Sequence, residues 1–596
     1  MNKKKLAIVG QCDKLDIRLL AGYEILALSI DSLYKFRKTN QKVYPIYEFC
    51  LEANSIDGQV SDADDLSLLF MEVDKELEKF LGFSNAFSAN SFWFIHRISS
   101  LIALNAILLK IKSQYQSVLI YSDYEPKVVN ENVSLFSTRF NSLATNLDFI
   151  LISLYQGLKD DMSVTSSYSS SPQIFKRKLL FIAGNLKRID SIIRKRVLYI
   201  LKKIIRMTKI KKANVFVAQV GYDVDFVKNE FNDINFFGID SFKKINFYNN
   251  SINKNTLKGF NSIIENTFND FLHKRVSNFK HLIIAMFEAY VKDTLIHLPQ
   301  AERLIEKRFI ALNPKALLFS IGIQSLMGEV LAKIAQKNNT PILTFKHSGA
   351  GNFFLTESFL EQFSEYQSRT ERYQFIHSSI ERKFIKPTSR NIKTINSRPL
   401  ITPKYLVGKI RKKKILYVMG PPSYFGLKEL SKTISDSERL KFLEKLLFTC
   451  NQFNIQLDIK IHPIGRENSI SLVRMILENE SFVNILPPGP VEKFFNHYDC
   501  ACFDMLASRS LAQAFTTEID IILFVPPNVK INNSTFGDLY ERVMVVRNIE
   551  SLDNILKSYY VDKIKPHINH KRFKSKYIFG DKPKELINRL ALFFYD

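Results

Sequence analysis

The hydrophobic and polar positions follow two patterns along the chain. Short runs of consecutive apolar residues predict buried strands, and longer segments with an apolar residue at every third or fourth position predict amphipathic helices. The predicted strands cover residues 6–9, 118–121, 149–152, 215–218, 236–239, 316–319, 341–345, 414–419, 457–461, 483–486, 500–503 and 519–525. The predicted helices cover residues 95–112, 326–336, 435–453, 491–497 and 508–514. Strands that alternate with helices are typical of a parallel α/β protein.

Breaks in this pattern divide the chain into regions. Residues 166–171 are serine apart from Tyr168 and predict a loop, and a proline-containing, basic stretch without periodicity predicts a linker. The expected regions are an α/β region over 1–165, a helical segment over 176–212, a Rossmann-like unit over 213–390, the linker over 391–412 and a second Rossmann-like unit over 413–596. The first region is expected to be either a separate domain or part of the unit that follows it.

The helical segment over 176–212 is strongly basic. It holds fourteen Lys or Arg and one acidic residue, Asp190, and its apolar residues recur at helical spacing. This pattern predicts a basic amphipathic helix. Such a helix either docks on an anionic membrane surface or lies on the side of a domain with its apolar stripe buried.

The net charge and composition limit the classes of molecule that the protein is expected to bind. The 596 residues include 84 Lys and Arg against 59 Asp and Glu, a net charge of +25, which favours contact with nucleic acid, an anionic membrane or a phosphorylated substrate. The basic residues form no zinc-finger, RNA-recognition or helix-turn-helix pattern. We therefore expect no nucleic-acid partner. A non-enzymatic nucleic-acid-binding protein stays as an alternative to the two enzyme classes described below. The hydrophobic fraction of 46% excludes a disordered chain.

Cysteine content and apolar run length predict the compartment. Five dispersed cysteines do not make a disulfide framework and favour a reducing environment. The apolar run at 6–9 is too short for a secretory signal, and the longest mainly apolar stretch, 98–109, is about half of what a bilayer needs. A cytoplasmic protein is expected, with a possible peripheral position on the inner membrane face.

One candidate binding loop follows the predicted strand 341–345. Ligands of open α/β sheets bind beyond the carboxyl ends of the strands. Glycines let the backbone approach a ligand, and a histidine can donate or accept a hydrogen bond. A tight turn with an incidental histidine explains the same pattern. The loop contains His347, Ser348, Gly349, Gly351 and Asn352.

Two strand ends of the last unit carry further candidates. Lys460 and His462 stand at the end of strand 457–461, where Pro463 fixes the histidine, and Gly420 opens the loop after strand 414–419. A histidine in this position can hold a phosphate or pyrophosphate.

The third candidate position follows strand 500–503. Asp504, Ser508 and Ser510 lie near the start of a predicted helix. Helix N-termini bind phosphate through their backbone N–H groups, and hydroxyls add neutral donors. Ordinary N-capping explains the same residues equally well.

Together these motifs resemble GT-B glycosyltransferases of bacterial surface-polysaccharide assembly, in particular the sialyltransferase-like and Kdo-transferase-like families. The resemblance covers residues 213–596. It implies two Rossmann-like domains that face a cleft, an acceptor-side domain over 213–390 and a donor domain over 413–596. As GT-B chains often do, the final helix, 586–594, is expected to return to the first of these domains.

The resemblance also implies an activity. A nucleotide sugar, CMP-linked and carrying a nonulosonic acid or Kdo, would donate to a capsule, lipopolysaccharide or O-antigen glycan. His462 and Ser508 or Ser510 would contact the donor phosphate. No cofactor and no metal are expected, because the donor carries its own leaving phosphate and His567 and His570 lack acidic or cysteine partners.

The catalytic base is assigned by position. Sialyltransferase-like families carry an acidic pair before glycine, and this sequence has no such triplet. An attacking hydroxyl needs a carboxylate within hydrogen-bond reach. Asp223 and Asp225, after strand 215–218, are the first candidates, and Glu357 is another; loop capping explains Asp223 as well.

A second activity class fits part of the same pattern. The segment 504–510 is similar to the Asp-Tyr-Ser-Ser region of CDP-glycerol glycerophosphotransferases, with Met505-Leu506-Ala507-Ser508 in place of Tyr-Ser-Ser. A polyol-phosphate transferase that uses CDP-glycerol or CDP-ribitol is therefore the alternative.

Overall fold

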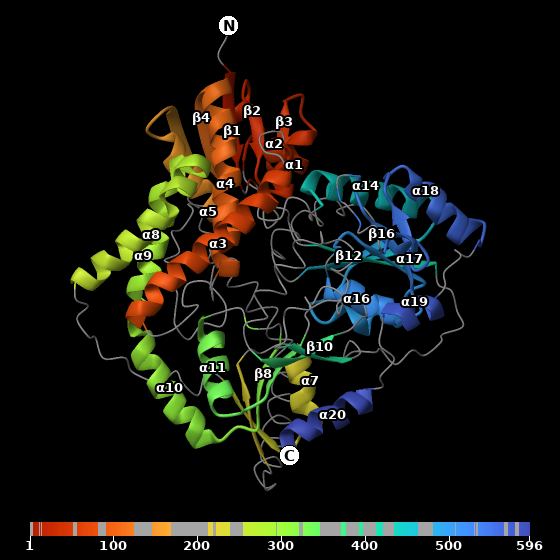
Figure 1. Cartoon of the computed structure of the whole chain (residues 1–596). Helices are drawn as coiled ribbons and strands as arrows, with labels where there is room; N and C mark the ends of the chain where they lie inside the picture. The colour runs from red at the N-terminus through yellow and green to blue at the C-terminus, as the bar shows by residue number, and fades with distance from the viewer. Residues whose placement is uncertain are drawn as a thin grey trace, which may run out of the picture.

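The computed structural model contains three parallel β-sheets with helices packed around them (Figure 1). The description covers residues 4–10, 12, 15–51, 56–81, 91–123, 146–168, 213–218, 222–238, 254–293, 295–320, 323, 326–345, 371–376, 392–396, 413–420, 434–462, 481–506, 508–527, 529, 531, 535–564, 570–577 and 583–595. The basic segment predicted over 176–212 lies outside these residues, so its membrane role stays a prediction.

The first sheet has five parallel strands in the order β3-β2-β1-β4-β5. Its strands are β1 (Lys4–Val9), β2 (Glu24–Ala27), β3 (Val43–Pro45), β4 (Tyr115–Ser122) and β5 (Ser163–Tyr168). Its helices are α1 (Ile30–Arg37), α2 (Ile46–Leu51), α3 (Ile56–Leu81), α4 (Ser91–Gln114) and α5 (Asn146–Leu158). The region expected over 1–165 is thus an α/β unit with a sheet of its own.

A helical layer connects the first sheet to the second. Helices α8 (Lys254–Arg275) and α9 (Lys280–Asp293) lie beside α3 and α4, and α10 (Leu298–Leu312) continues this layer to α11 of the second unit (Figure 1). One continuous apolar core includes side chains from all of these helices and from both sheets. Aromatic rings carry much of the contact, as where Phe94 of α4 meets Phe287 of α9 with ring centroids 5.3 Å apart. Burial of this size fixes the two units to each other.

The second sheet has six parallel strands in the order β11-β10-β9-β8-β6-β7. Its strands are β6 (Ala213–Val217), β7 (Ile234–Gly238), β8 (Ala316–Phe319), β9 (Ile342–Phe345), β10 (Arg372–Ile376) and β11 (Ile392–Asn396). Helix α7 (Tyr222–Glu230) and helix α11 (Leu326–Lys337) belong to the same unit.

The third sheet has six parallel strands in the order β14-β13-β12-β15-β16-β17. Its strands are β12 (Lys414–Met419), β13 (Gln456–Ile461), β14 (Val483–Ile485), β15 (Cys500–Phe503), β16 (Asp520–Phe524) and β17 (Met544–Val546). Its helices include α14 (Asp436–Gln452), α16 (Arg509–Thr516), α17 (Phe536–Tyr540), α18 (Ser551–Leu556) and α19 (His570–Tyr577). In chain order this is 3-2-1-4-5-6, the strand order of the Rossmann dinucleotide-binding fold.

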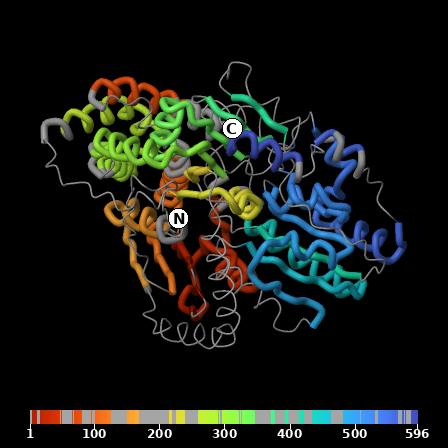
Figure 2. The backbone as a smooth tube through the Cα atoms, turned by 90° about the horizontal axis from the view of Figure 1, so that it is seen from below, coloured from red at the N-terminus to blue at the C-terminus, as the bar shows by residue number. Residues whose placement is uncertain are grey.

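The last helix, α20 (Pro583–Tyr595), returns from the third unit to the second. Leu586, Leu590 and Phe594 are buried in one core with strands β6, β8 and β9, and Figure 2 shows α20 in dark blue close to those strands. The expected return of this helix is confirmed. Two Rossmann-like units bridged by a returning C-terminal helix make the GT-B-like arrangement that the sequence predicts, extended by an N-terminal α/β unit.

Three local predictions are wrong. Residues 149–152 lie in helix α5 and not in a strand, because an apolar run of four residues fits a buried helix as well as a strand. Residues 166–168 are not loop: they end strand β5, which pairs with β4 at the edge of the first sheet. Residues 392–396 are not linker, since they form β11, the edge strand that pairs with β10.

Candidate functional site

The strand order of the third sheet places its switch point between β12 and β15. From this pair the connections run in opposite directions, and open α/β sheets bind ligands beyond the carboxyl ends of such strands. Gly420 directly follows β12, and Asp504 directly follows β15. These two residues, with the neighbouring strand and helix ends, are called the switch-point site below.

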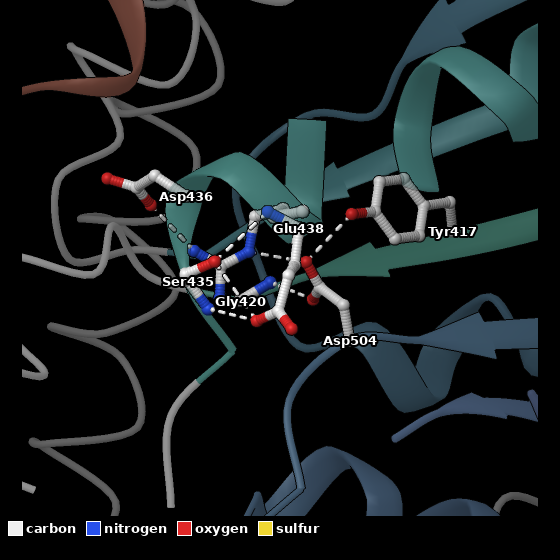
Figure 3. Close-up of polar contacts among 7 residues, drawn as sticks. Tyr417, Gly420, Ser435, Asp436, Glu438 and Asp504 are labelled. Carbon is white, nitrogen blue, oxygen red and sulfur yellow. Dashed lines mark hydrogen bonds and ion pairs between the residues drawn. The ribbon is translucent and has the colours of Figure 1, made fainter. Parts of the chain in front are cut away.

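Asp504 is the centre of a buried polar network (Figure 3). Its side chain is 1% exposed. The Tyr417 hydroxyl donates to Oδ2 at 2.7 Å, the Gly420 backbone N–H donates to Oδ1 at 2.5 Å and Arg439 Nε donates to Oδ2 at 2.5 Å. Arg439 continues through Nη1 to Asp436 Oδ1 at 3.0 Å. The carboxylate of Asp504 is therefore held by protein donors.

Charges inside this network stabilise one another. Burial favours the neutral guanidinium, but the carboxylates of Asp504 and Asp436 prevail and raise the pKa of Arg439 above its ordinary value. Burial, together with the negative charge of Asp504, raises the pKa of Tyr417 well above its ordinary value. The tyrosine therefore stays a neutral donor and the arginine a cation at physiological pH.

Glycine is required at position 420 by the closeness of its neighbours. A Cβ atom at this position would lie 3.0 Å from Arg439 Nη2 and 3.2 Å from Asp504 Oδ1. Both distances are shorter than ordinary van der Waals contact. Since the charged network can move away only by stretching its hydrogen bonds, a side chain on the residue after β12 is disfavoured.

Helix α14 begins beside Gly420 with a capping box, a pattern that Ser435 and Glu438 already show in the sequence. Ser435 Oγ accepts the backbone N–H of Glu438 at 3.1 Å, and the Glu438 carboxylate accepts the backbone N–H of Ser435 at 3.0 Å (Figure 3). This reciprocal cap satisfies two of the N–H groups that a helix start leaves open. It fixes the first turn of α14, which carries Asp436 and Arg439 of the network.

Lys460 and His462 lie at the end of β13, the strand next to β12. Lys460 is only 6% exposed; its Nζ donates to the Pro487 carbonyl and lies 5.1 Å from the centre of the Phe494 ring. His462 follows the strand directly and is half-buried. A cation and an imidazole thus stand at the carboxyl edge of the sheet, as the sequence predicts.

Glu492 is a candidate that sequence reasoning missed. It lies in a short 3-10 helix, Val491–Lys493, and is 6% exposed. Burial raises the pKa of its carboxyl, while the positive charges of Arg509, Lys493 and Lys460 act to lower it. The sequence feature that could have pointed to Glu492 is the Pro-Pro-Gly-Pro turn before it, because the segment after this turn starts at the same edge of the sheet.

Helix α16 carries the predicted serines. Ser508 is its N-cap, and its Oγ accepts the backbone N–H of Leu511 at 3.0 Å. The capping alternative for Ser508 therefore holds in this structure. Ser510 lies half-buried in the first turn. At the other end, the guanidinium of Arg542 donates to the carbonyls of Ala514 and Thr517 and stabilises the negative end of the helix.

Of the remaining predicted residues, the structure describes Asp223 and Asp225, which belong to the second unit. Asp225 is exposed on α7 in the second unit, and Asp223 lies in the same helix. Several predicted residues lie outside the described part of the chain: His347, Ser348, Gly349, Gly351, Asn352, Glu357 and Pro463. Their proposed roles stay predictions.

No group of three or more His, Cys, Asp or Glu side chains in the described part of the chain is placed to hold a metal ion. None of the helices that the structure describes is both long enough and apolar enough to span a bilayer.

Comparison with known proteins gives matches of structure only. No protein-family profile and no curated protein matches the sequence. A co-structure of Staphylococcus aureus MnaA with UDP matches with a TM-score of 0.38 and 11% identity, over 64% of this chain and 96% of that chain.

Two further matches have the same extent in this chain. The UDP-GlcNAc 2-epimerase of Methanocaldococcus jannaschii, in complex with UDP-GlcNAc and UDP, matches with a TM-score of 0.36 and 10% identity, over 64% of this chain and 99% of that chain. Acinetobacter baumannii MurG matches with a TM-score of 0.35 and 11% identity, over 64% of this chain and 99% of that chain. Each is a likeness of fold.

Proposed function

We propose that this chain is a GT-B-type glycosyltransferase that holds a nucleotide-activated sugar at the switch-point site of the third sheet. The observation that supports this most directly is the position of Gly420, Asp504, Lys460 and His462. Residues from three adjacent strands gather at the carboxyl edge of a sheet with Rossmann strand order. Nucleotide phosphates bind at this place in open α/β sheets.

The phosphate would lie near the positive groups of this edge. Lys460 and His462 end β13, and Arg509 is the first residue of α16, whose N-terminus carries partial positive charge. Such groups stabilise the charge that develops on a departing nucleotide phosphate, because they are already oriented before the reaction. In this proposal Lys460 and Arg509 supply positive charge, and His462 and the N-terminus of α16 supply hydrogen-bond donors.

We infer that Glu492 binds the ribose. A carboxylate accepts hydrogen bonds from adjacent hydroxyls, and an acidic residue performs this task in Rossmann nucleotide sites. The positive charges of Arg509, Lys493 and Lys460 favour the ionised form of Glu492 against burial. Ribose hydroxyls would replace the water that an ionised carboxylate loses when it is buried.

The donor is proposed to be CMP-linked and to carry a nonulosonic acid or Kdo. This step rests on the resemblance of Lys460-Ile461-His462-Pro463 and the serine-bearing start of α16 to the CMP-sugar families. The acceptor is proposed to be a bacterial surface glycan held mainly by the second unit. Asp223, Asp225 and Glu357 are the candidates for its base, because α7 follows β6 at the carboxyl edge of that sheet.

A location on the inner face of the cytoplasmic membrane is part of the proposal. It rests on the charge of residues 176–212, which hold fourteen basic side chains. Neutralising the basic residues of this segment should reduce pelleting with phosphatidylglycerol vesicles. Unchanged pelleting would remove this part of the proposal.

The proposed function is tested by a thermal-shift screen of the full chain with CMP, CDP, UDP, GDP and ADP. A selective rise of the melting temperature with CMP is the expected result. Mass spectrometry of the acceptor after incubation with a CMP-sugar then identifies the transferred group, which separates a sugar from a polyol phosphate. Absence of a shift with any of the five nucleotides would contradict nucleotide binding at this site.

A further inference from the structure

The second sheet contains a buried arginine whose donors are not all used. Arg372 is the first residue of β10 and is 1% exposed. Its Nε and Nη2 atoms are buried and have no hydrogen-bond partner among the residues that the structure describes. Buried polar groups are nearly always hydrogen-bonded, and an arginine is rarely buried without a partner. This pair of atoms therefore needs an explanation.

The position of Arg372 on the strand shows what surrounds it. Side chains alternate between the two faces of a strand, so Tyr373 and Phe375 point to the face that α20 covers. Tyr373 and Phe593 of α20 have ring centroids 4.6 Å apart. Arg372 and Gln374 therefore point to the opposite face.

That opposite face is covered by α11 and is partly polar. Ile342 of β9 belongs to the core that includes α11, and Thr344, two residues later on the same face, pairs with Gln374 of β10. Thr344 and Gln374 are both buried. Polar side chains thus continue from Arg372 across two neighbouring strands.

The charge of Arg372 is only partly compensated. Burial lowers the pKa of its guanidinium to about 9, and the negative charge of Glu329 on α11 acts in the opposite direction. Glu329 accepts no hydrogen bond from Nε or Nη2. A second negative group in direct contact would restore the pKa and satisfy both donors.

The two open donors have a specific geometry. Nε–H and one Nη2–H lie on the same edge of the planar guanidinium and point in parallel. This edge matches the two oxygens of a carboxylate or phosphate, which bind arginine in bidentate fashion. The oxygen of a water molecule or hydroxyl has two lone pairs and can accept from both donors, but only an oxyanion also compensates the buried positive charge.

We propose that Arg372 binds an oxyanion, the carboxylate or phosphate group of a ligand of the second unit, through its Nε/Nη2 edge. This site lies on a different sheet from the switch-point site and stands whether or not the donor assignment holds. The ligand would be an acidic substrate, or a free inorganic anion that regulates or stabilises this unit.

The test is the melting temperature of the full chain titrated with inorganic phosphate, glucose 6-phosphate and gluconate, with glucose as the neutral control. Wild type should be stabilised by oxyanions and not by glucose. Arg372→Met should melt at or above the wild-type temperature without ligand, because a buried charge is removed, and should require at least about tenfold more anion for the same shift. Arg372→Lys keeps the positive charge but not the two parallel N–H donors of the guanidinium, so it should need a similarly raised anion concentration.

Controls separate this site from others. Arg303→Met removes an exposed arginine of α10 and should respond to anions as wild type does. His462→Ala alters the switch-point site and shows which part of the anion response arises there. A response that persists in Arg372→Met but disappears in His462→Ala would place the anion at the switch-point site and overturn the inference. So would a lower melting temperature of Arg372→Met and Arg372→Lys with an unchanged anion response, which is the signature of a structural arginine. Stabilisation by phosphate but not by the organic anions would identify the ligand as the inorganic ion.

Discussion

The backbone N–H of Gly420 donates a hydrogen bond to the carboxylate of Asp504, a residue 84 positions later in the chain. The bond joins the ends of β12 and β15 at the point where the third sheet reverses its strand order. The same carboxylate binds Arg439 and Tyr417. One buried side chain thus fixes the end of β12, the first turn of α14 and the end of β15 relative to one another.

Replacing Asp504 should therefore destabilise the third unit strongly. Asp504→Ala leaves the buried Arg439 with fewer partners, and breaking a buried ion pair from one side costs about 3–5 kcal/mol. Urea unfolding followed by tryptophan and tyrosine fluorescence measures the loss. Glu371→Ala is the matched control, because Glu371 and Lys393 form an exposed pair, which contributes at most about 1 kcal/mol. Equal effects of the two substitutions would contradict the structural role of Asp504.

Gly420→Ala should lower both stability and nucleotide binding. The added Cβ would lie 3.0 Å from Arg439 Nη2, so either the loop or the guanidinium must move. We expect a loss of about 1–3 kcal/mol, as for other overpacked positions, and a weaker thermal shift with CMP. Gly537→Ala is the control, because a Cβ at position 537 meets nothing within 4 Å. If both alanine variants behave alike, close packing around Gly420 is not the reason for its glycine.

His462→Ala should remove nearly all transfer activity and leave the fold intact. The side chain is half-buried at the end of a strand, so its removal creates little cavity. Loss of a donor that stabilises developing charge lowers the rate by about 100- to 1,000-fold in comparable sites. The measurement is kcat/KM for the CMP-sugar together with the circular dichroism spectrum. His273→Ala, on the exposed face of α8, is the control, and normal turnover by His462→Ala would remove the donor-site assignment.

Stability should depend on pH through Glu492. Burial raises the pKa of Glu492 in the folded protein above its value in the unfolded chain. The folded state therefore holds the proton more tightly, and as pH rises through the two pKa values the folded protein loses stability. The Glu492→Gln side chain cannot ionise. The free energy of unfolding of this variant, relative to that of wild type, should therefore rise between pH 4 and pH 7. A difference that is the same at both pH values would show that ionisation of Glu492 costs nothing.

Glu492→Gln should also weaken ribonucleotide binding selectively. If the carboxylate accepts from the ribose hydroxyls, the substitution should reduce affinity for CMP by about tenfold and affinity for 2′-deoxy-CMP by less. Isothermal titration calorimetry of wild type and variant with both nucleotides measures the two losses of affinity. Equal losses for the two nucleotides would place the carboxylate elsewhere than at the 2′-hydroxyl.

Local elements could be predicted where the sequence signal is local. The capping box of Ser435 and Glu438 was readable, because both partners lie within one helical turn. Strands β12, β13, β15 and β16 were readable as apolar runs between turns. Helix α5 was mistaken for a strand over 149–152, because a helix that is buried on most sides lacks the polar face that makes it recognisable.

Long-range relationships decide the remainder. The serines of β5 form a strand because β4 offers its backbone as a partner, which no local propensity indicates. Arg372 gives no sequence signal, since its burial depends on α11 covering its face of the second sheet.

By itself the sequence determined the parallel α/β class, most strand and helix positions of the last unit and the polar residues at the strand ends. Only the tertiary structure decided that Asp504 reaches Gly420, that Glu492 is buried near the charges of Arg509 and Lys460, and that Arg372 is buried with two open donors. The physical reason is that periodicity and capping act over a few residues. Which strands become neighbours depends instead on burial and pairing across the whole chain.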